Sequence, residues 1–447
     1  MATGRTRAEK PSPPIPEGWE DLLSESLGRK ERKLLRETLD TAAVRKAVRL
    51  QKISLPDLSN AIPDIYEAVQ WAERAFFIRS DHILGKHMLH AAGAYYLQEA
   101  SAMAAVGALS IKDGQRVLDL CAAPGGKSGQ IAALLNGSGL LVANDCNPQR
   151  AGILCANLAR LGVENALVTA EAPVRLAERF PAAFDRVLVD APCSGEGLFR
   201  KEPESRLQWS AAGVRGCAKR QRALLNCAAR MVRAGGLIVY STCTFNRIEN
   251  EDVVRAFLNI NPEFSAEDFS LPGLPQSAGG MLYLYPHVIP GEGQFIARMR
   301  RIDDALSETT PRARRPETIP RRESEMFGRF RSTAIPGWNR QGALRKSCNR
   351  LCWVNGTFPE ADKYEGLKVR SVGIELGRFT GCSFIPSRAF AMSILASEAA
   401  ARIDLDDDDA RAWLSGKKLK INEMEWSLVT YRGFPIGFAG KDTANRR

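Results

Sequence analysis

Two cysteines stand where two buried strands are expected to end side by side. Cys193 follows the apolar run in VLVDAPCSGEG (187–197), and Cys243 follows the run in LIVYSTCTF (237–245). A thiolate is a strong nucleophile, yet few reactions use two thiols at one sheet edge without a metal or a disulfide. Covalent attack on a pyrimidine ring is one: the first thiol adds to the ring and the second helps to release the product. The spacing alone does not decide which cysteine attacks.

The turn that carries Cys193 indicates chemistry at a ring carbon. Asp190 ends the strand before it, where a carboxylate could hold the ring nitrogen or the exocyclic amine of a base. Cytosine C5 is too weak a nucleophile to attack a sulfonium directly, but a thiolate added at C6 makes C5 enamine-like. A lowered thiol pKa needs nearby positive charge, for which Lys127, Arg200 and Lys201 are the candidates. The target base must be single-stranded or leave its stack.

Upstream, the segment VLDLCAAPGGKSGQ (117–130) predicts a strand, a turn of small residues and the start of a helix, which is where doubly wound sheets hold a cofactor. Gly125 and Gly126 let the backbone approach a ligand with no Cβ in the way. The glycines of a dinucleotide fingerprint or a phosphate loop are missing. Asp145 closes the next strand, where an acidic residue would bind the two ribose hydroxyls of a nucleoside cofactor.

The elements that must position these residues alternate from Gln115 onward. Continuous apolar runs separated by helical segments indicate a parallel sheet covered by helices on both faces. Two further apolar runs, 281–286 and 294–300, predict closing strands. The expected parallel strands cover 116–120, 140–145, 166–170, 185–192 and 237–242, and the expected helices lie near 127–135, 149–160, 213–233 and 249–259.

The flanking regions read as accessory parts. Residues 1–16 predict a disordered lead-in. Leucine spacing from Gly18 to Lys52 predicts amphipathic helices whose other face is either solvated or in contact with RNA. Residues 303–333, rich in Arg, Pro and Glu, predict a linker, and 334–447 predicts a compact α+β domain. The basic positions of the N-terminal helices are Arg29, Lys30, Arg32, Lys33, Arg36, Arg45, Lys46 and Arg49.

Composition bounds the partners and the compartment. The chain has 447 residues and a formal net charge of +11, which suits a polyanionic partner and a merely basic enzyme about equally. It shows no signal-peptide pattern and no apolar stretch of membrane-spanning length, so we expect a cytoplasmic protein whose ten cysteines are reduced thiols. Cys348 and Cys352 lack a second Cys/His pair, so we expect no metal site.

Taken together, DLCAAPGGK (119–127), Asp145, DAPCSGEG (190–197) and STCTF (241–245) resemble the motifs of the NOL1/NOP2/Sun family of RNA cytosine-5 methyltransferases. The resemblance covers about residues 80–300. Three further segments are similar to the bacterial RsmF-like branch, which modifies a cytosine of small-subunit ribosomal RNA and carries a PUA-like RNA-binding region. These are GEGLFRKEPE (195–204), GLKVRSVGIELGRF (366–379) and PIGFAGK (435–441).

The resemblance implies an α/β fold: a Rossmann-like domain over 106–302 that depends on S-adenosylmethionine (AdoMet), a helical N-terminal RNA-binding extension over 17–105, and a PUA-like domain over 334–447. It also implies a role for each motif. Cys243 would add to C6, Cys193 would assist breakdown of the adduct, and Asp190 would lie between cofactor and base. Asp145 would take the ribose. AdoMet would be lined by Cys121, Ala122, Ala123, Pro124, Gly125, Gly126 and Lys127.

The family often has an acidic residue near the adenine after the third strand, and here Glu171 is the candidate. The expected partner is RNA, most of all 16S ribosomal RNA, and the expected state is a monomer. Two alternatives stay open: a tRNA cytosine-5 methyltransferase, and a non-catalytic ribosome-assembly factor with a vestigial domain. A DNA cytosine methyltransferase is disfavoured, because the Pro-Cys-Gln turn of those enzymes is absent.

Overall fold

The computed structural model describes residues 12–40, 45–51, 65–79, 84–303, 319–359, 364–381, 383–417 and 425–440. Most of the expected disordered lead-in (1–16) and half of the expected linker (303–333) fall outside these residues. No helix within the described ranges is long and apolar enough to cross a membrane.

A nine-stranded sheet forms the centre of the described structure, in the order β10-β12-β9-β8-β5-β6-β7-β15, with β11 beside β12. The chain runs from β5 outward to β7 and then returns to the other side of β5, so the strand order reverses there and leaves a place for ligands at the carboxyl ends. Five strands are parallel: β5 (Arg116–Asp119), β6 (Leu140–Asn144), β7 (Ala166–Thr169), β8 (Phe184–Asp190) and β9 (Val232–Thr242).

Three strands close this sheet beyond β9. Strand β12 (Gln294–Arg301) is antiparallel to β9, and β10 (Phe264–Ala266) and β11 (Met281–Leu284) pair with its other edge. Helices cover both faces, and each face has its own apolar core. The helices are α5 (Ala100–Gly107), α6 (Gly126–Leu134), α7 (Pro148–Arg160), α8 (Pro173–Arg179), α9 (Ala211–Met231) and α10 (Glu251–Ile260). The predicted alternation of strand and helix is therefore confirmed.

The N-terminal region is only partly helical, unlike the prediction. Helices α1 (Trp19–Leu23) and α2 (Arg29–Asp40) are present, but the next stretch forms strand β1 (Lys46–Leu50). Pairing on both edges overrides the helical leucine spacing there, because β1 lies between β3 and β4. That sheet also holds β2 (Ile65–Ala68), β3 (Ala75–Ile78) and β4 (Tyr95–Leu97). Between β3 and β4 the chain forms η1 (Leu84–Lys86) and α4 (Met88–Ala91).

Arg49 accordingly does not belong to an exposed basic face. It is 2% exposed and donates hydrogen bonds to the side-chain oxygens of Gln98 and Gln51. Burial lowers the pKa of Arg49 to about 9. Its guanidinium also lies against Gly129 of α6, so this arginine packs the N-terminal sheet against the central α/β domain.

The C-terminal region begins inside the expected linker. Helix α11 (Arg321–Ala334) forms there because Phe327, Phe330 and Ala334 fall on one face and are buried. It packs on a sheet of β13 (Gly342–Ser347), β14 (Arg350–Asn355), β16 (Ile374–Thr380) and β17 (Ser383–Pro386). After α13 (Arg388–Ser393) and η4 (Ala396–Glu398) come β18 (Arg402–Leu405), α14 (Asp407–Leu414), β19 (Trp426–Tyr431) and β20 (Phe434–Gly440).

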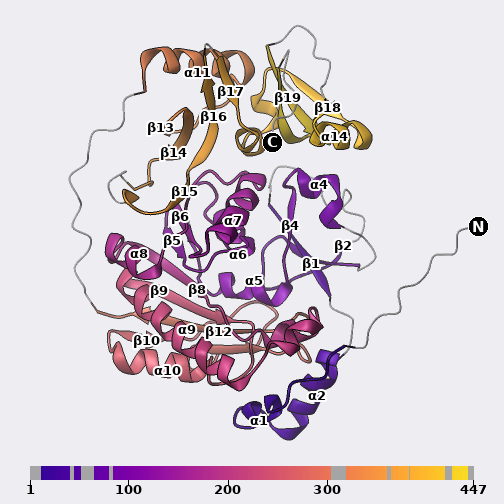
Figure 1. Cartoon of the computed structure of the whole chain (residues 1–447), viewed down its shortest axis with the longest axis vertical. Coiled ribbons are helices and arrows are strands. Elements are labelled where there is room, and N and C mark those ends of the chain that lie inside the picture. The colour runs from indigo at the N-terminus through magenta and orange to yellow at the C-terminus, as the bar shows by residue number, and fades with distance from the viewer. Residues whose placement is uncertain are drawn as a thin grey trace, which may run out of the picture.

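The accessory regions are packed firmly against the rest of the molecule (Figure 1). Strand β15 (Val369–Val372), expected in the C-terminal domain, pairs with β7 and so extends the central sheet. One apolar core joins Leu84 and Met88 of the N-terminal region to Trp413 and Ile436 of the C-terminal region. The carboxyl end of α4 is also bound by Arg388, which donates to the carbonyl of Ala91 at 3.0 Å.

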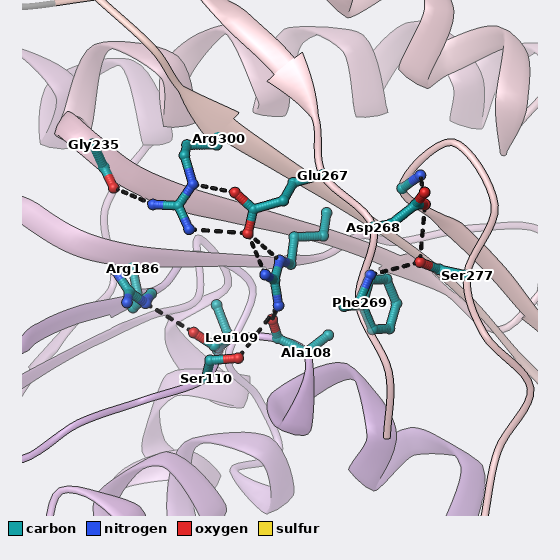
Figure 2. Close-up of polar contacts among 12 residues, drawn as sticks. Ala108, Leu109, Ser110, Arg186, Gly235, Glu267, Asp268, Phe269, Ser277 and Arg300 are labelled. Atoms are coloured by element: carbon teal, nitrogen blue, oxygen red, sulfur yellow. Dashed lines mark hydrogen bonds and ion pairs between the residues drawn. The ribbon is translucent and has the colours of Figure 1, made fainter. Parts of the chain in front are cut away.

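A group of arginines lies at the amino ends of the parallel strands, where β12 also ends (Figure 2). Glu267 accepts hydrogen bonds from both Arg298 and Arg300, and Arg300 also donates to the carbonyl of Gly235 at 2.7 Å. The hydrogen bond from Arg300 is the main reason why the pKa of Glu267 falls to about 2. This carboxylate holds β10 and β12 together on the edge opposite to the cysteines.

We expect Glu267→Gln to lower the free energy of unfolding by about 3 kcal/mol at neutral pH. The pKa of Glu267 is lowered by folding, so its stabilisation is present above its ordinary pKa of 4.5 and disappears as pH falls toward 2. The urea midpoints of wild type and variant should therefore converge as the pH falls from about 5 toward 2. A gap independent of pH would contradict this account. Glu25→Gln, which removes an exposed partner of Arg247, is the matched control and should change little.

Candidate active site

The two cysteines lie together at the carboxyl edge of the sheet. Strands β8 and β9 are parallel neighbours whose register pairs Asp190 with Ser241, so the loops that follow them start side by side. The Sγ atoms of Cys193 and Cys243 are 3.4 Å apart, and both residues are partly buried. Either sulfur could thus approach the ring of a bound base. The apolar runs before the two cysteines predict that both lie at this edge of the sheet.

The surroundings of the two sulfurs are not equivalent. The hydrogen bond with Cys243 raises the pKa of the Cys193 thiol well above its ordinary range, and burial and the charge of Glu249 add to this effect. These effects favour a Cys193 that keeps its proton, and the geometry of the sulfur–sulfur contact fits either atom as the donor. A proton kept on Cys193 would leave Cys243 as the candidate nucleophile of the pair.

Asp190 is held by three side chains from different elements. Lys127 Nζ lies 2.8 Å from Asp190 Oδ2, and the Oδ1 atom accepts hydrogen bonds from Ser241 Oγ at 2.7 Å and Gln294 Nε2 at 3.2 Å. Burial alone would lower the pKa of Lys127, but the charge of Asp190 outweighs it and the pKa is raised. Cys243 adds to this rise, so the Lys127 ammonium acts electrostatically on that sulfur.

The other two predicted cations have different partners. Arg200 donates to the carbonyl of Gly291, and Lys201 lies 3.2 Å from a carboxylate oxygen of Glu292. Both hold the loop before β12. Of the three candidates, Lys127 is therefore the cation whose charge acts on the Cys243 sulfur.

The turn from Cys121 to Lys127 connects β5 to α6. Gly125, with φ of 110°, precedes the helix and leaves its first turn without a side-chain cap. The free N–H groups and the positive end of the helix suit a carboxylate. Ala122 and Ala123 are buried, and Arg150 donates to the carbonyl of Ala123 at 2.8 Å. Arg150 Nη2 also lies 3.3 Å from Asp145 Oδ2, so it ties this turn to the end of β6.

Two acidic groups beside this turn fit a cationic nucleoside ligand. Asp145 is buried at the end of β6 and accepts the N–H of Asn147 at 3.0 Å through Oδ1. Asp119 is fully buried at the end of β5, and burial is the main cause that raises its pKa to about 7. Its Oδ2 accepts from Ser128 Oγ at 2.7 Å, while Oδ1 has no partner among the described residues. A buried free acceptor of this kind fits the ammonium or hydroxyl groups of AdoMet.

Cys121 and Pro124 complete the turn. Burial raises the pKa of the Cys121 thiol well above its ordinary range, and the charges of Asp119, Asp190 and Asp145 add to it. Cys121 is therefore a neutral thiol among carboxylates, suited to line a pocket and not to attack. The Pro124 carbonyl accepts a hydrogen bond from Asn157 at 2.9 Å, which anchors the turn on α7.

Glu171 has a structural partner that the sequence does not reveal. Its two carboxylate oxygens accept the backbone N–H groups of Ala172 and Lys368 at 2.9 and 3.1 Å. Burial opposes ionisation, but these hydrogen bonds outweigh it and lower the pKa of Glu171. The residue thus fastens the start of β15 to the end of β7, and both oxygens are already engaged.

Several polar residues of the site could not be predicted from the sequence, because their hydrogen-bond partners lie far away in the chain. Asn144 links the loops after β5, β6 and β7: its amide donates to the carbonyls of Leu120 and Glu171, and its oxygen accepts from Thr169. Its only sequence signal is a polar residue inside an apolar strand. Glu196, Asn246 and Glu249 form a buried network behind the cysteines, and the sole hint there is their spacing after each cysteine.

No group of three or more His, Cys, Asp or Glu side chains in the described ranges is arranged to hold a metal ion. Cys348 is exposed at the turn between β13 and β14, and Cys352 lies within β14.

Three family models match the chain. Residues 106–300 match 16S rRNA methyltransferase RsmB/F, residues 15–100 match the N-terminal domain of 16S rRNA methyltransferase RsmF, and residues 400–444 match the methyltransferase RsmF PUA domain. The PUA match thus covers β18 to β20. The preceding sheet of β13, β14, β16 and β17 lies outside it.

Relatives match most of the chain in sequence. The chain is 32% identical over 430 residues to ribosomal RNA small subunit methyltransferase F of Serratia proteamaculans, covering 89% of this chain and 87% of the relative. It is also 32% identical over 391 residues to the protein of that name from Escherichia coli O157:H7, covering 83% and 81%.

Solved structures resemble the central part. A methyltransferase homologue from Pyrococcus horikoshii, 26% identical, superposes with a TM-score of 0.53 over 64% of this chain and 99% of its own. The crystal structure of NSun6 from Pyrococcus horikoshii with SFG, an AdoMet analogue, has a TM-score of 0.58, covers 65% and 99%, and at 19% identity shows the shared fold.

Proposed function

Because this chain belongs to the RsmB/F family of AdoMet-dependent RNA methyltransferases, we propose that it methylates C5 of a cytosine in 16S ribosomal RNA through a covalent intermediate. The observation that carries the proposal is the pair of sulfurs 3.4 Å apart, next to a carboxylate held by Lys127. Two thiols beside a fixed carboxylate are what addition to C6, followed by elimination, requires.

AdoMet would be held by the turn from Cys121 to Lys127 and by Asp145, and it supplies an electrophilic methyl group. The free N–H groups at the start of α6 would bind the carboxylate of its amino-acid part. Asp145, buried at the end of β6, would accept hydrogen bonds from the ribose hydroxyls. Glu171 was a weaker candidate for the adenine, and its bonds to Ala172 and Lys368 support a structural role instead.

The chain's own residues would divide the work on the base as follows. The Cys243 thiolate would add to C6 and move the electron pair of the C5–C6 double bond into the ring, while the Asp190 carboxylate would accept a hydrogen bond from the exocyclic amine. Lys127 would stabilise the charge on Cys243 before attack and keep Asp190 in place. After C5 has gained its methyl group, Cys193 would give its proton to the departing Cys243 sulfur and then take the C5 proton, so that the C6–S bond breaks and the ring regains its double bond.

We further propose that the enzyme acts as a monomer in the cytoplasm. All groups assigned to cofactor, base and covalent chemistry come from one chain, so a partner copy need not complete the site. Sedimentation at micromolar concentration should give a single species near the chain mass of 49.1 kDa, and a stable dimer would contradict this.

The substrate can be tested directly with tritiated AdoMet. We expect label in 16S ribosomal RNA, either free or in the small subunit, with bisulfite sequencing mapping it to cytosine. Label confined to tRNA would replace the proposed substrate with the alternative one. Binding of AdoMet without transfer to any of these RNAs would identify a non-catalytic assembly factor.

We expect Asp145→Asn to raise the Kd for AdoMet by about 10- to 100-fold, since hydrogen bonds to a charged group contribute about 1.5–3 kcal/mol. Asparagine keeps the acceptor for the N–H of Asn147 but loses the charge that would face the ribose. Titration calorimetry measures this effect. Asp113→Asn, in the exposed loop before β5, is the control and should leave the Kd unchanged. An unchanged Kd for Asp145→Asn as well would remove Asp145 from the cofactor site.

A further inference from the structure

Two glutamates with no assigned role lie directly behind the cysteine loops. Glu196 follows Cys193 by three residues, and Glu249 follows Cys243 by six; both are fully buried. Within the described residues neither carboxylate forms an ion pair with Lys or Arg. Burying a carboxylate without a cation is costly, so such groups need many hydrogen bonds and a reason to be there.

Each glutamate binds the loop of the other cysteine. Glu196, on the Cys193 loop, accepts the backbone N–H groups of Phe245 and Asn246 at 2.7 and 3.2 Å. Glu249, on the Cys243 side, accepts the backbone N–H of Ser194 at 3.0 Å and also its hydroxyl. Ser194 directly follows Cys193, and Phe245 and Asn246 follow Cys243 by two and three residues, so the two sets of hydrogen bonds cross between the loops.

Further contacts make the arrangement rigid. Asn246 Nδ2 lies 2.9 Å from an oxygen of each glutamate and so joins them. Trp209 Nε1 donates to Glu196 at 3.2 Å, and Gln221 Nε2 donates to Glu249 at 2.8 Å. The backbone N–H of Gly197 also donates to the Cys243 carbonyl at 2.8 Å, and a Cβ at Gly197 would lie 3.1 Å from that oxygen.

We propose that Glu196 and Glu249 are positioning residues that fix the two cysteine loops against each other, Glu196 setting the loop of Cys243 for attack and Glu249 setting the loop of Cys193 for release. The inference rests on the proposed function, because it assigns each glutamate to one step of that reaction. Neither glutamate touches the base. The charge of Glu249 also helps to keep Cys193 protonated.

The two glutamates should therefore fail in opposite ways when changed to glutamine, which keeps the shape but turns one acceptor into a donor. Glu249→Gln should keep the attack by Cys243 and slow release, so a covalent RNA adduct accumulates while kcat falls about 100-fold. Glu196→Gln should slow formation of the adduct by about 100-fold in single-turnover experiments, and no adduct should accumulate. The KM for RNA should change little in both.

The readout is the fraction of enzyme bound covalently to 16S ribosomal RNA on a denaturing gel, followed over time beside methyl transfer. Glu398→Gln, which alters a buried carboxylate bound to Arg340 in the C-terminal region, is the matched control and should behave as wild type. Melting curves and AdoMet binding determine the folded fraction of each variant, and rates are expressed per folded molecule.

The Cys193→Ala enzyme is measured in parallel. It distinguishes a failure of the proposed covalent chemistry from a failure of the positioning role of the two glutamates. If it fails to trap an adduct, the proposed chemistry is wrong. If it traps one, equal adduct kinetics for Glu196→Gln and Glu249→Gln would overturn the positioning proposal. Loss of activity that only follows the folded fraction would overturn it as well.

Discussion

Cys243→Ala is expected to lower methyl transfer to RNA by at least about 10⁴-fold, because it removes the atom that would bond to C6. Cys193 would still be buried and would still face the charge of Glu249, and both oppose formation of a thiolate, so it should not take over readily. Lys127 and Asp190 would remain in place, so cofactor and base should still bind. Incorporation of tritium from AdoMet into 16S ribosomal RNA measures the loss.

The control for this prediction is Cys155→Ala, a partly buried cysteine on α7 that lies outside the sheet edge. It should keep wild-type activity. An AdoMet-induced rise in melting temperature should persist in Cys243→Ala, which shows that the site is intact. Transfer within tenfold of wild type would exclude Cys243 as the nucleophile.

Cys193→Ala is expected to limit the enzyme to about one turnover. In the proposed mechanism Cys243 can form its bond to C6 without the Cys193 sulfur. Release of the methylated base, by contrast, would need that sulfur. The adduct should therefore accumulate as a complex that survives denaturation, with no more than about one methyl group per enzyme. Because the two sulfurs are 3.4 Å apart, Cys193 would lie beside a base bonded to Cys243.

Gel mobility in denaturant, before and after nuclease digestion, measures this adduct. Cys227→Ala, a buried cysteine on α9, should give none. Multiple turnovers by Cys193→Ala would show that release does not depend on this thiol. An adduct in the Cys243→Ala enzyme instead would mean that the two roles are reversed.

The sheet and its edge were predictable because their signals are local. Each rim residue follows a continuous apolar run, and parallel strands bring their carboxyl ends to one edge. Cys193, Cys243, Asp145 and the turn before Lys127 were placed correctly for that reason. Carboxyl ends that share an edge do not determine hydrogen bonds, however, so the contact of Lys127 with Asp190 was not predicted.

Predictions failed where tertiary pairing decides the outcome. The stretch around Arg49 has helical leucine spacing, but its neighbours β3 and β4 make it a strand. Glu171 stays a predicted adenine contact, but its hydrogen bond with the N–H of Lys368, about 200 positions later in the chain, could not be predicted. The segment around Phe327 is poor in apolar residues, yet three on one face suffice to form α11.

The wild-type enzyme and an RNA substrate with 5-fluorocytosine at the target position provide the most direct test of the mechanism. Fluorine at C5 cannot leave as a proton does, so the adduct persists after methyl transfer and its attachment site can be found by tryptic mass spectrometry. The account predicts the nucleotide on the peptide Ala234–Arg247, which contains Cys243. The nucleotide on Val187–Arg200, which contains Cys193, or on neither peptide, would contradict it.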